Sequence, residues 1–260
     1  MGPIGIFDSG FGGLTVARAV IDLLPWSDVV YLGDTARYPY GPRQLDEVAG
    51  FAHQIADHLV AHHGISLLVV ACNTASAAAL DDLADRLTIP VIGVIEPGVR
   101  AVASTTETGR VGVIGTVGTI DSGAYQRSIA AVAPEVELVP LSCPGFVEFV
   151  ERGETDSGQA HVLAERLLAP MVSAEVDALL LGCTHYPYLA RTIADVMGHD
   201  VTLVSSADET AFEVRRLLGV GETSTPIHRF LTTGDVGWFT EQGGRLLGPE
   251  LDRSVRVDLV

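Results

Sequence analysis

The chain has 260 residues, of which 47% are hydrophobic and 19% are charged, and its formal net charge is −17. The length fits one or two globular domains, and the acidic balance argues against direct binding to nucleic acid or to an anionic membrane. The chain contains no lysine, and all 16 residues of the lysine and arginine type are arginine. This excludes a pyridoxal-phosphate enzyme, which needs a lysine Schiff base, and a phosphate-binding loop of the Gly-Lys-Ser/Thr type.

The cysteine content and the first residues predict a cytoplasmic protein. Only three cysteines are present, without close spacing, so we expect reduced thiols rather than disulfides. No uncharged apolar run reaches the length of roughly 18 residues that a membrane span needs. The chain leads directly into IGIFDSG, without the basic segment of a signal peptide.

Strand-like and helix-like patterns alternate along the first part of the chain. We predict strands at residues 4–7, 29–32, 67–71 and 91–95. Helical patterns separate them, at residues 14–24, at about residues 44–61, and from the third strand to residue 87. Alternation of this kind favours parallel strands whose faces are covered by helices.

The second part of the chain repeats this scheme. Strands are predicted at residues 111–114, 137–140, 178–181 and 201–204, and helices at residues 125–132, 159–169, 188–197 and 207–218. We therefore expect an α/β fold of two similar domains, each a mainly parallel sheet flanked by helices. Residues 1–96 with 206–260 would form the first domain and residues 97–205 the second, with the active site in the cleft between them.

Two pairs of similar segments support the repeat. LLVVACNTAS, with Cys72, matches ALLLGCTHYP, with Cys183, and IGIFDSGFGG matches VGVIGTVGT. The distance from Gly5 to Cys72 is 67 positions, and the distance from Gly112 to Cys183 is 71. One thiol on each wall of a cleft would suit a reaction that needs two bases on opposite faces of one carbon.

Polar and reactive residues follow the predicted strands, where ligands bind in open α/β sheets. Those residues are Asp8, Ser9, Tyr40, Gly41, Cys72, Asn73, Thr74, Thr116, Thr119, Cys183, Thr184 and His185. Free N–H groups at a helix start favour a thiolate and bind carboxylates, so we expect lowered thiol pKa values and a small anionic ligand.

Simpler interpretations remain for several of these residues. A cysteine at a strand end can be a small buried hydrophobe, and we assign Cys143 that structural role. Asp8, Ser9, Asn73 and Thr74 can serve as turn and cap residues. Cys183 and His185 lack the close partners of a zinc site, and DSGFGG lacks the GxGxxG spacing of a dinucleotide loop. We expect no metal.

The chain resembles the glutamate racemases, cofactor-independent enzymes that supply D-glutamate for bacterial peptidoglycan. The resemblance covers nearly the whole chain and rests on IGIFDSGFGGLTV, YLGDTARYPYG, ACNTAS, IGVIEPG, LGCTHYP and LTTGD. It implies two similar α/β domains with the site between them, glutamate as substrate, no cofactor and a homodimer.

The resemblance also implies roles for individual residues. Cys72 and Cys183 would transfer protons, with Asp8 beside the first thiol, and His185 and a glutamate beside the second. That glutamate maps to Glu151, with Glu148 as a nearby competitor. The residues implied to bind substrate are Asp8, Ser9, Tyr40, Gly41, Asn73, Thr74, Thr116, Thr119, Thr184 and His185.

Three other functions stay open from the sequence. An aspartate or hydantoin racemase of the same superfamily would share the two thiols. A lyase or decarboxylase of related fold would need only one of them, and a non-enzymatic protein that binds an acidic metabolite would need neither.

Overall fold

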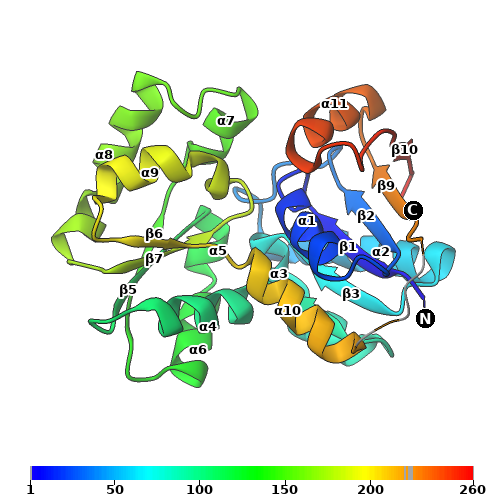
Figure 1. Cartoon of the computed structure of the whole chain (residues 1–260), viewed down its shortest axis with the longest axis horizontal. Coiled ribbons are helices and arrows are strands. Elements are labelled where there is room, and N and C mark those ends of the chain that lie inside the picture. Colours follow the sequence, from blue (N-terminus) through cyan, green and yellow to red (C-terminus); the bar gives the residue numbers. More distant parts are fainter. Residues whose placement is uncertain (1, 220, 222–224, 260) are drawn as a thin grey trace. The chain divides into compact units, whose positions relative to one another are not determined.

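The structure, a computed structural model, describes residues 2–219, 221 and 225–259. The chain forms two compact units, the first from Met1–Val94 and Ala207–Val260 and the second from Ile95–Ser206 (Figure 1). Each unit is a parallel sheet with helices on both faces. The predicted fold class, α/β with parallel sheets flanked by helices, is confirmed.

The sheet of the first unit has six parallel strands in the order β10-β9-β2-β1-β3-β4. The strands are β1 (Ile4–Asp8), β2 (Val29–Gly33), β3 (Leu67–Val70), β4 (Val91–Gly93), β9 (His228–Thr232) and β10 (Val255–Arg256). Side chains of successive residues enter opposite cores, as the two-residue period of a strand requires. Ile4 and Ile6 of β1 belong to one core, and Phe7 belongs to the other.

Five helices cover the two faces of this sheet. One core contains residues of α1 (Leu14–Leu23), α10 (Ala207–Leu218) and α11 (Val236–Leu247). The other core contains residues of α2 (Leu45–His63) and α3 (Asn73–Arg86). Because both faces are buried, the central strands are almost continuously apolar, which explains why their sequences lack alternation.

The second unit has four parallel strands in the order β6-β5-β7-β8. The strands are β5 (Arg110–Gly115), β6 (Glu137–Ser142), β7 (Ala178–Gly182) and β8 (Thr202–Val204). A buried core joins one face to α7 (Phe146–Glu151), α8 (Gly158–Ser173), the short 3-10 helix η1 (Tyr186–Leu189) and α9 (Ala190–Met197). The remaining helices are α4 (Ile95–Thr105), α5 (Val117–Asp121) and α6 (Ala124–Val132), and α4 packs against β7 and α6.

The two sheets share one topology. The order β2-β1-β3-β4 in the first unit corresponds to β6-β5-β7-β8 in the second. In each sheet, the second strand lies on one side of the first strand, and the third and fourth strands lie on the other side. The strand order therefore reverses between the first and third strands, and doubly wound sheets bind ligands at this point. In both repeats, the helix that follows the fourth strand belongs to the other unit. α4 follows β4 of the first unit but packs in the second, and α10 follows β8 of the second unit but packs against α1 and β4 in the first.

The structure adds elements that the sequence patterns did not predict. α4 begins at the segment IEPG, where the sequence patterns predicted a domain boundary and no helix. α8 continues past Pro170 to Ser173, four residues beyond the predicted end, because a proline in the last turn removes only one N–H donor. Among the described residues, no helix combines the length and the apolar character that crossing a membrane would require.

Candidate active site

In the first unit, the predicted residues lie at the carboxyl ends of three neighbouring strands. Asp8 is the last residue of β1, and Cys72 follows β3, which pairs with β1. Tyr40 and Gly41 lie in the loop after β2, the strand on the other side of β1. The parallel register therefore brings Asp8 and Cys72 to the same edge of the sheet.

Cys72 is the N-cap residue of α3 and its side chain is 5% exposed. The backbone N–H of Ala75, and the hydroxyl and backbone N–H of Ser9, lie near the sulfur and act to lower the pKa of the thiol. Burial and the nearby charge of Asp8 nevertheless raise the pKa of the thiol to about 12. The expected lowering of this pKa is therefore wrong: the helix start and the three donors oppose burial without overcoming it.

Asp8 is fully buried, and its Oδ2 accepts a hydrogen bond of 2.9 Å from the backbone N–H of Gly10. The N-terminus of α1 approaches this carboxylate closely, since α1 begins just after Gly13. A Cβ atom at position 13 would lie 2.5 Å from the Cβ of Asp8 and 3.0 Å from that of Ala71. Glycine in DSGFGG thus permits a close approach to the buried carboxylate, rather than binding a dinucleotide.

Three further predicted residues border Cys72. Asn73 and Thr74 are the first two residues of α3, and both are buried. The ring of Tyr40 lies in the same apolar cluster as Cys72. Its hydroxyl donates a hydrogen bond to the carboxylate of Asp34, a residue for which the sequence patterns predicted no role.

The second unit repeats this arrangement. Cys183 follows β7 directly and precedes Thr184 and His185, and all three side chains are buried. Thr116 follows β5, the strand that pairs with β7, and its hydroxyl lies 2.9 Å from that of Thr119. A thiol, an imidazole and three hydroxyl-bearing side chains therefore meet at one edge of this sheet.

His185 is held as a neutral imidazole at neutral pH. Its side chain is 2% exposed, and burial lowers its pKa to about 4. The hydroxyl of Thr184 lies 3.5 Å from its Nδ1. A neutral imidazole can accept a proton from a neighbouring thiol or donate a hydrogen bond to a ligand.

Two tyrosines beside Cys183 were missed. Tyr125 of α6 is fully buried, and a Cβ atom built on Gly182 would lie 2.8 Å from its hydroxyl. Tyr186 is also buried and donates a hydrogen bond of 3.1 Å to the carbonyl oxygen of Cys143. Burial, and then the charge of Cys183, raise the pKa of both phenols. The sequence alone does not single out these tyrosines, because a buried aromatic residue on a helix has the same pattern as an ordinary core residue.

The two candidate glutamates both lie on α7. Glu148 and Glu151 are three positions apart, so they lie on neighbouring parts of one helical face. The Glu148 side chain is exposed and Glu151 is half-buried. The charge of Glu148 contributes to the raised pKa of Tyr186, after burial and the two neighbouring thiols.

The arrangement favours proton transfer by the side chains themselves. The first unit presents a thiol next to a carboxylate, and in the second a buried imidazole lies two residues after the buried thiol. No group of three or more His, Cys, Asp or Glu residues within the described ranges could hold a metal ion. Each unit thus offers one buried thiol together with a buried titratable side chain at the same edge of its sheet.

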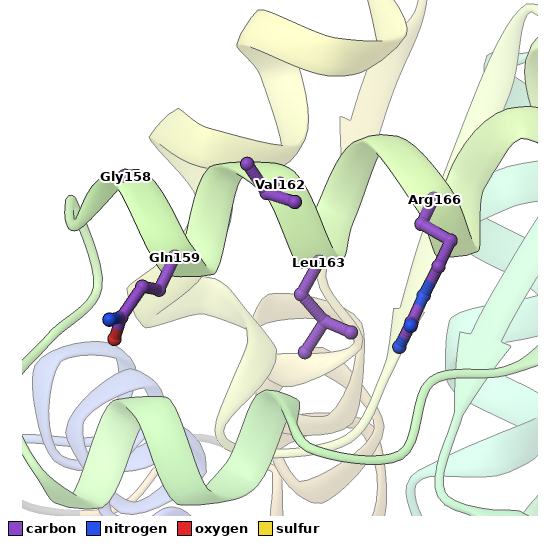
Figure 2. A pocket seen from close by; sticks show the side chains of 5 residues that line it. All are labelled: Gly158, Gln159, Val162, Leu163 and Arg166. Carbon is purple, nitrogen blue, oxygen red and sulfur yellow. The ribbon is translucent and has the colours of Figure 1, made fainter.

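A hollow elsewhere in the second unit lacks reactive groups. It runs along α8, where Gln159, Leu163 and Arg166 point to one side of the helix (Figure 2). Leu163 packs near Gly145, where an added Cβ would lie 2.9 Å from its Cδ2. Without a nucleophile or a carboxylate among its lining residues, this hollow is not a candidate for catalysis.

Comparison with known proteins gives consistent results along the whole chain. The model of the Asp/Glu/Hydantoin racemase family matches residues 14–214. The glutamate racemase of Parafrankia sp. (strain EAN1pec) is 52% identical over 255 residues, which cover 96% of this chain and 92% of the relative.

Two solved structures are similar over both units. The glutamate racemase isoform RacE1 of Bacillus anthracis has a TM-score of 0.94 at 42% identity, over 99% of this chain and 98% of that one. The glutamate racemase of Francisella tularensis, solved in complex with D-glutamate, has a TM-score of 0.92 at 34% identity, over 99% and 97% of the two chains.

Proposed function

The chain belongs to the Asp/Glu/Hydantoin racemase family, and on this premise we propose that it is a glutamate racemase, an isomerase that interconverts L- and D-glutamate. One observation carries the proposal from the structure. Each repeat of the same sheet topology ends its third strand at a buried cysteine, Cys72 in one unit and Cys183 in the other. Relatives at about half identity are named glutamate racemase, so an aspartate or hydantoin racemase, or a non-enzymatic protein that binds an acidic metabolite, is not favoured.

We assign the two thiols to opposite faces of one substrate α-carbon. One sulfur, as thiolate, removes the α-proton, and the thiol on the other face supplies a proton to form the opposite enantiomer. The reverse reaction exchanges the two roles. Proximity of both sulfurs to the α-carbon would supply a large part of the rate acceleration.

The raised pKa of Cys72 suits this chemistry. The α-proton of an amino acid is very weakly acidic, so a base of higher pKa transfers it with less loss of driving force. A thiol of pKa about 12 is mostly protonated at neutral pH, so a neighbouring group must take its proton. We assign this task to Asp8 for Cys72 and to His185, together with Glu151, for Cys183.

The remaining polar residues would bind the substrate. N–H groups and hydroxyls at helix starts stabilise carboxylates and the negative charge that develops in the transition state. We propose contacts from Asp8, Ser9, Tyr40, Gly41, Asn73, Thr74, Thr116, Thr119, Thr184 and His185. The reaction would supply D-glutamate for peptidoglycan in the cytoplasm, and the protein would act as a homodimer, which sedimentation equilibrium would test.

The test is racemisation without added cofactor. Purified protein should convert L-glutamate to D-glutamate and the reverse, and in D2O each product should carry deuterium at the α-carbon. Cys72→Ala and Cys183→Ala should each abolish conversion, whereas Cys143→Ala, at a buried thiol outside the proposed chemistry, should keep it. Faster turnover of aspartate or a hydantoin than of glutamate would reassign the substrate, and near-full activity of either alanine variant would disprove the two-thiol mechanism.

A further inference from the structure

A carboxylate next to the proposed site organises the loop that carries Tyr40. Asp34 follows β2 directly and its side chain is 0% exposed. It begins the β2–α2 loop, which comprises residues 34–44 and contains the proposed substrate contacts Tyr40 and Gly41. Burial of a carboxylate lowers the stability of the fold unless its oxygens accept hydrogen bonds or pair with a cation. The partners of Asp34 therefore identify the segments that it holds in place.

Three donors converge on this carboxylate. Oδ1 accepts a hydrogen bond of 2.7 Å from the hydroxyl of Thr233. Oδ2 accepts from Nε of Arg37 at 2.7 Å and also from the hydroxyl of Tyr40. The loop is thereby tied to the segment after β9, which is 199 positions away in sequence.

Neighbouring contacts strengthen the same link. The backbone N–H of Ala36 donates to the hydroxyl of Thr233 at 3.0 Å, and the hydroxyls of Thr35 and Thr232 lie 2.6 Å apart. The LTTGD segment thus receives a structural explanation: its two threonines fasten the β2–α2 loop from the adjacent strand.

An ionised carboxylate satisfies all three partners in their present orientation. All three side chains donate, and an ionised aspartate presents acceptors alone. An asparagine of the same shape would replace one acceptor oxygen by an NH2 group, so the hydroxyl that faces it would have to turn around and accept. It would also remove the negative charge beside the Arg37 guanidinium, which lies 4.1 Å above the ring of Phe51.

The network extends to both reactive groups of the first unit. The backbone N–H of Asp34 donates to the carbonyl oxygen of Asp8 at 3.0 Å. Tyr40 packs in the cluster that contains Cys72, and the charge of a Cys72 thiolate is felt at the Tyr40 phenol. The Asp34 carboxylate therefore holds a side chain of the same buried cluster that contains the thiol.

We propose that Asp34 is a positioning residue that, by accepting the hydrogen bonds of Tyr40 and Thr233, holds the β2–α2 loop against Cys72. It acts on the reaction through that loop and does not touch the reacting atoms. The effect on substrate binding rests on the proposed function, but the effect on the Cys72 thiol does not.

The first test measures the thiol directly. Each variant is treated with iodoacetamide, and the alkylation rates of Cys72, Cys143 and Cys183 are followed by peptide mass spectrometry. Asp34→Asn should speed alkylation of Cys72 by at least about fivefold and leave the two thiols of the second unit unchanged. Tyr40→Phe, which keeps the ring and removes one donor, should act in the same direction but less strongly, and the double variant should not exceed Asp34→Asn alone.

Asp28→Asn is the matched control. Asp28 lies directly before β2, whereas Asp34 lies directly after it, and the Asp28 carboxylate also accepts a hydrogen bond, of 2.7 Å from the N–H of Ile227. It should leave the alkylation of Cys72 unchanged. If Asp34→Asn and Tyr40→Phe leave Cys72 as slow as in the parent, or speed all three thiols equally, the carboxylate is only a stabilising group and the proposal is wrong. Should Asp34→Asn not fold, the Tyr40→Phe result decides alone.

The second test is kinetic. Asp34→Asn should raise KM for both enantiomers of glutamate about tenfold, with a smaller fall in kcat, because the loop binds substrate without supplying the base. A fall in kcat with unchanged KM would contradict a positioning role. If the parent protein does not racemise glutamate at all, the proposed function is wrong. The alkylation experiment would still test whether Asp34 positions the loop against Cys72.

Discussion

Ser9 lies beside Cys72, and both its backbone N–H and its hydroxyl favour the thiolate form of that cysteine. The two residues are far apart in sequence but follow adjacent strands, β1 and β3. Hydrogen bonds to a thiolate stabilise the charged form, so Ser9 opposes the rise that burial and Asp8 impose on the pKa of Cys72.

Ser9→Ala should therefore raise the pKa of Cys72 further. Loss of one hydrogen bond to a charged group corresponds to roughly one pKa unit. Alkylation of Cys72 at fixed pH should slow by about tenfold, as peptide mapping would measure, with Cys143 as the internal control. An unchanged rate would mean that the hydroxyl does not act on the sulfur.

Asp8→Asn should have opposite effects on the thiol and on the reaction. Removing the charge lowers the pKa of Cys72, because the Asp8 carboxylate raises it, so alkylation should become faster. Racemisation should nevertheless fall by about 10²-fold, since the group that exchanges a proton with the thiol is lost. Asp22→Asn, at a side chain that is 62% exposed on α1, should change neither quantity. Faster racemisation by Asp8→Asn would remove Asp8 from the proposed mechanism.

Gly182→Ala should disrupt the second unit next to Cys183. The added Cβ would lie 2.7 Å from the carbonyl oxygen of Ile114 and 2.8 Å from the Tyr125 hydroxyl. The free energy of unfolding should fall by about 2 kcal/mol, the typical cost of overpacking. Gly50→Ala is the control, because its Cβ would meet nothing within 4 Å inside α2 and should stabilise by about 0.5 kcal/mol. Denaturant unfolding of both variants gives the comparison, and equal stability would contradict the predicted clash.

Glu151→Gln and Glu148→Gln distinguish the two candidate glutamates. If Glu151 is the carboxylate that assists Cys183, Glu151→Gln should lower kcat by about tenfold or more, and Glu148→Gln should change it by less than about twofold. The two variants carry the same substitution on the same short helix, so each is the control for the other. The reverse ranking would transfer the role to Glu148.

Asp177 should make the second unit sensitive to acid. Burial acts to raise its pKa, but hydrogen bonds from the Thr106 hydroxyl and the N–H groups of Glu107 and Thr108 lower it to about 2. Because the folded-state pKa is depressed, this contribution to stability is complete above the unfolded value near 3.9 and is lost as the pH falls toward 2.

Asp177→Asn should accordingly lower the free energy of unfolding at pH 7, by about 1 kcal/mol since the site is close to solvent. The difference from the parent should shrink between about pH 4 and pH 2, as urea titrations at several pH values would show. Asp195→Asn, at an exposed position on α9, should show no such difference. A difference that stays constant with pH would rule out the depressed carboxyl as its cause.

Local sequence determined the architecture of this protein to a large extent. Buried strands and amphipathic helices show characteristic patterns of apolar residues over short contiguous segments. The α/β class and the repeat around Cys72 and Cys183 could therefore be predicted. The placement of polar residues after strands follows from the same local pattern. The active roles of these residues stay predictions, because geometry within each unit does not by itself test them.

Tertiary structure decided what surrounds each reactive group. The pKa of Cys72 rises because burial and the charge of Asp8 depend on neighbours in space, whereas the sequence showed only a helix start that lowers it. The Tyr125 hydroxyl beside Gly182, and the convergence of Tyr40 and Thr233 on Asp34, join segments that are distant along the chain. Desolvation, packing and side-chain hydrogen bonds act between such segments, and no pattern in contiguous residues encodes them.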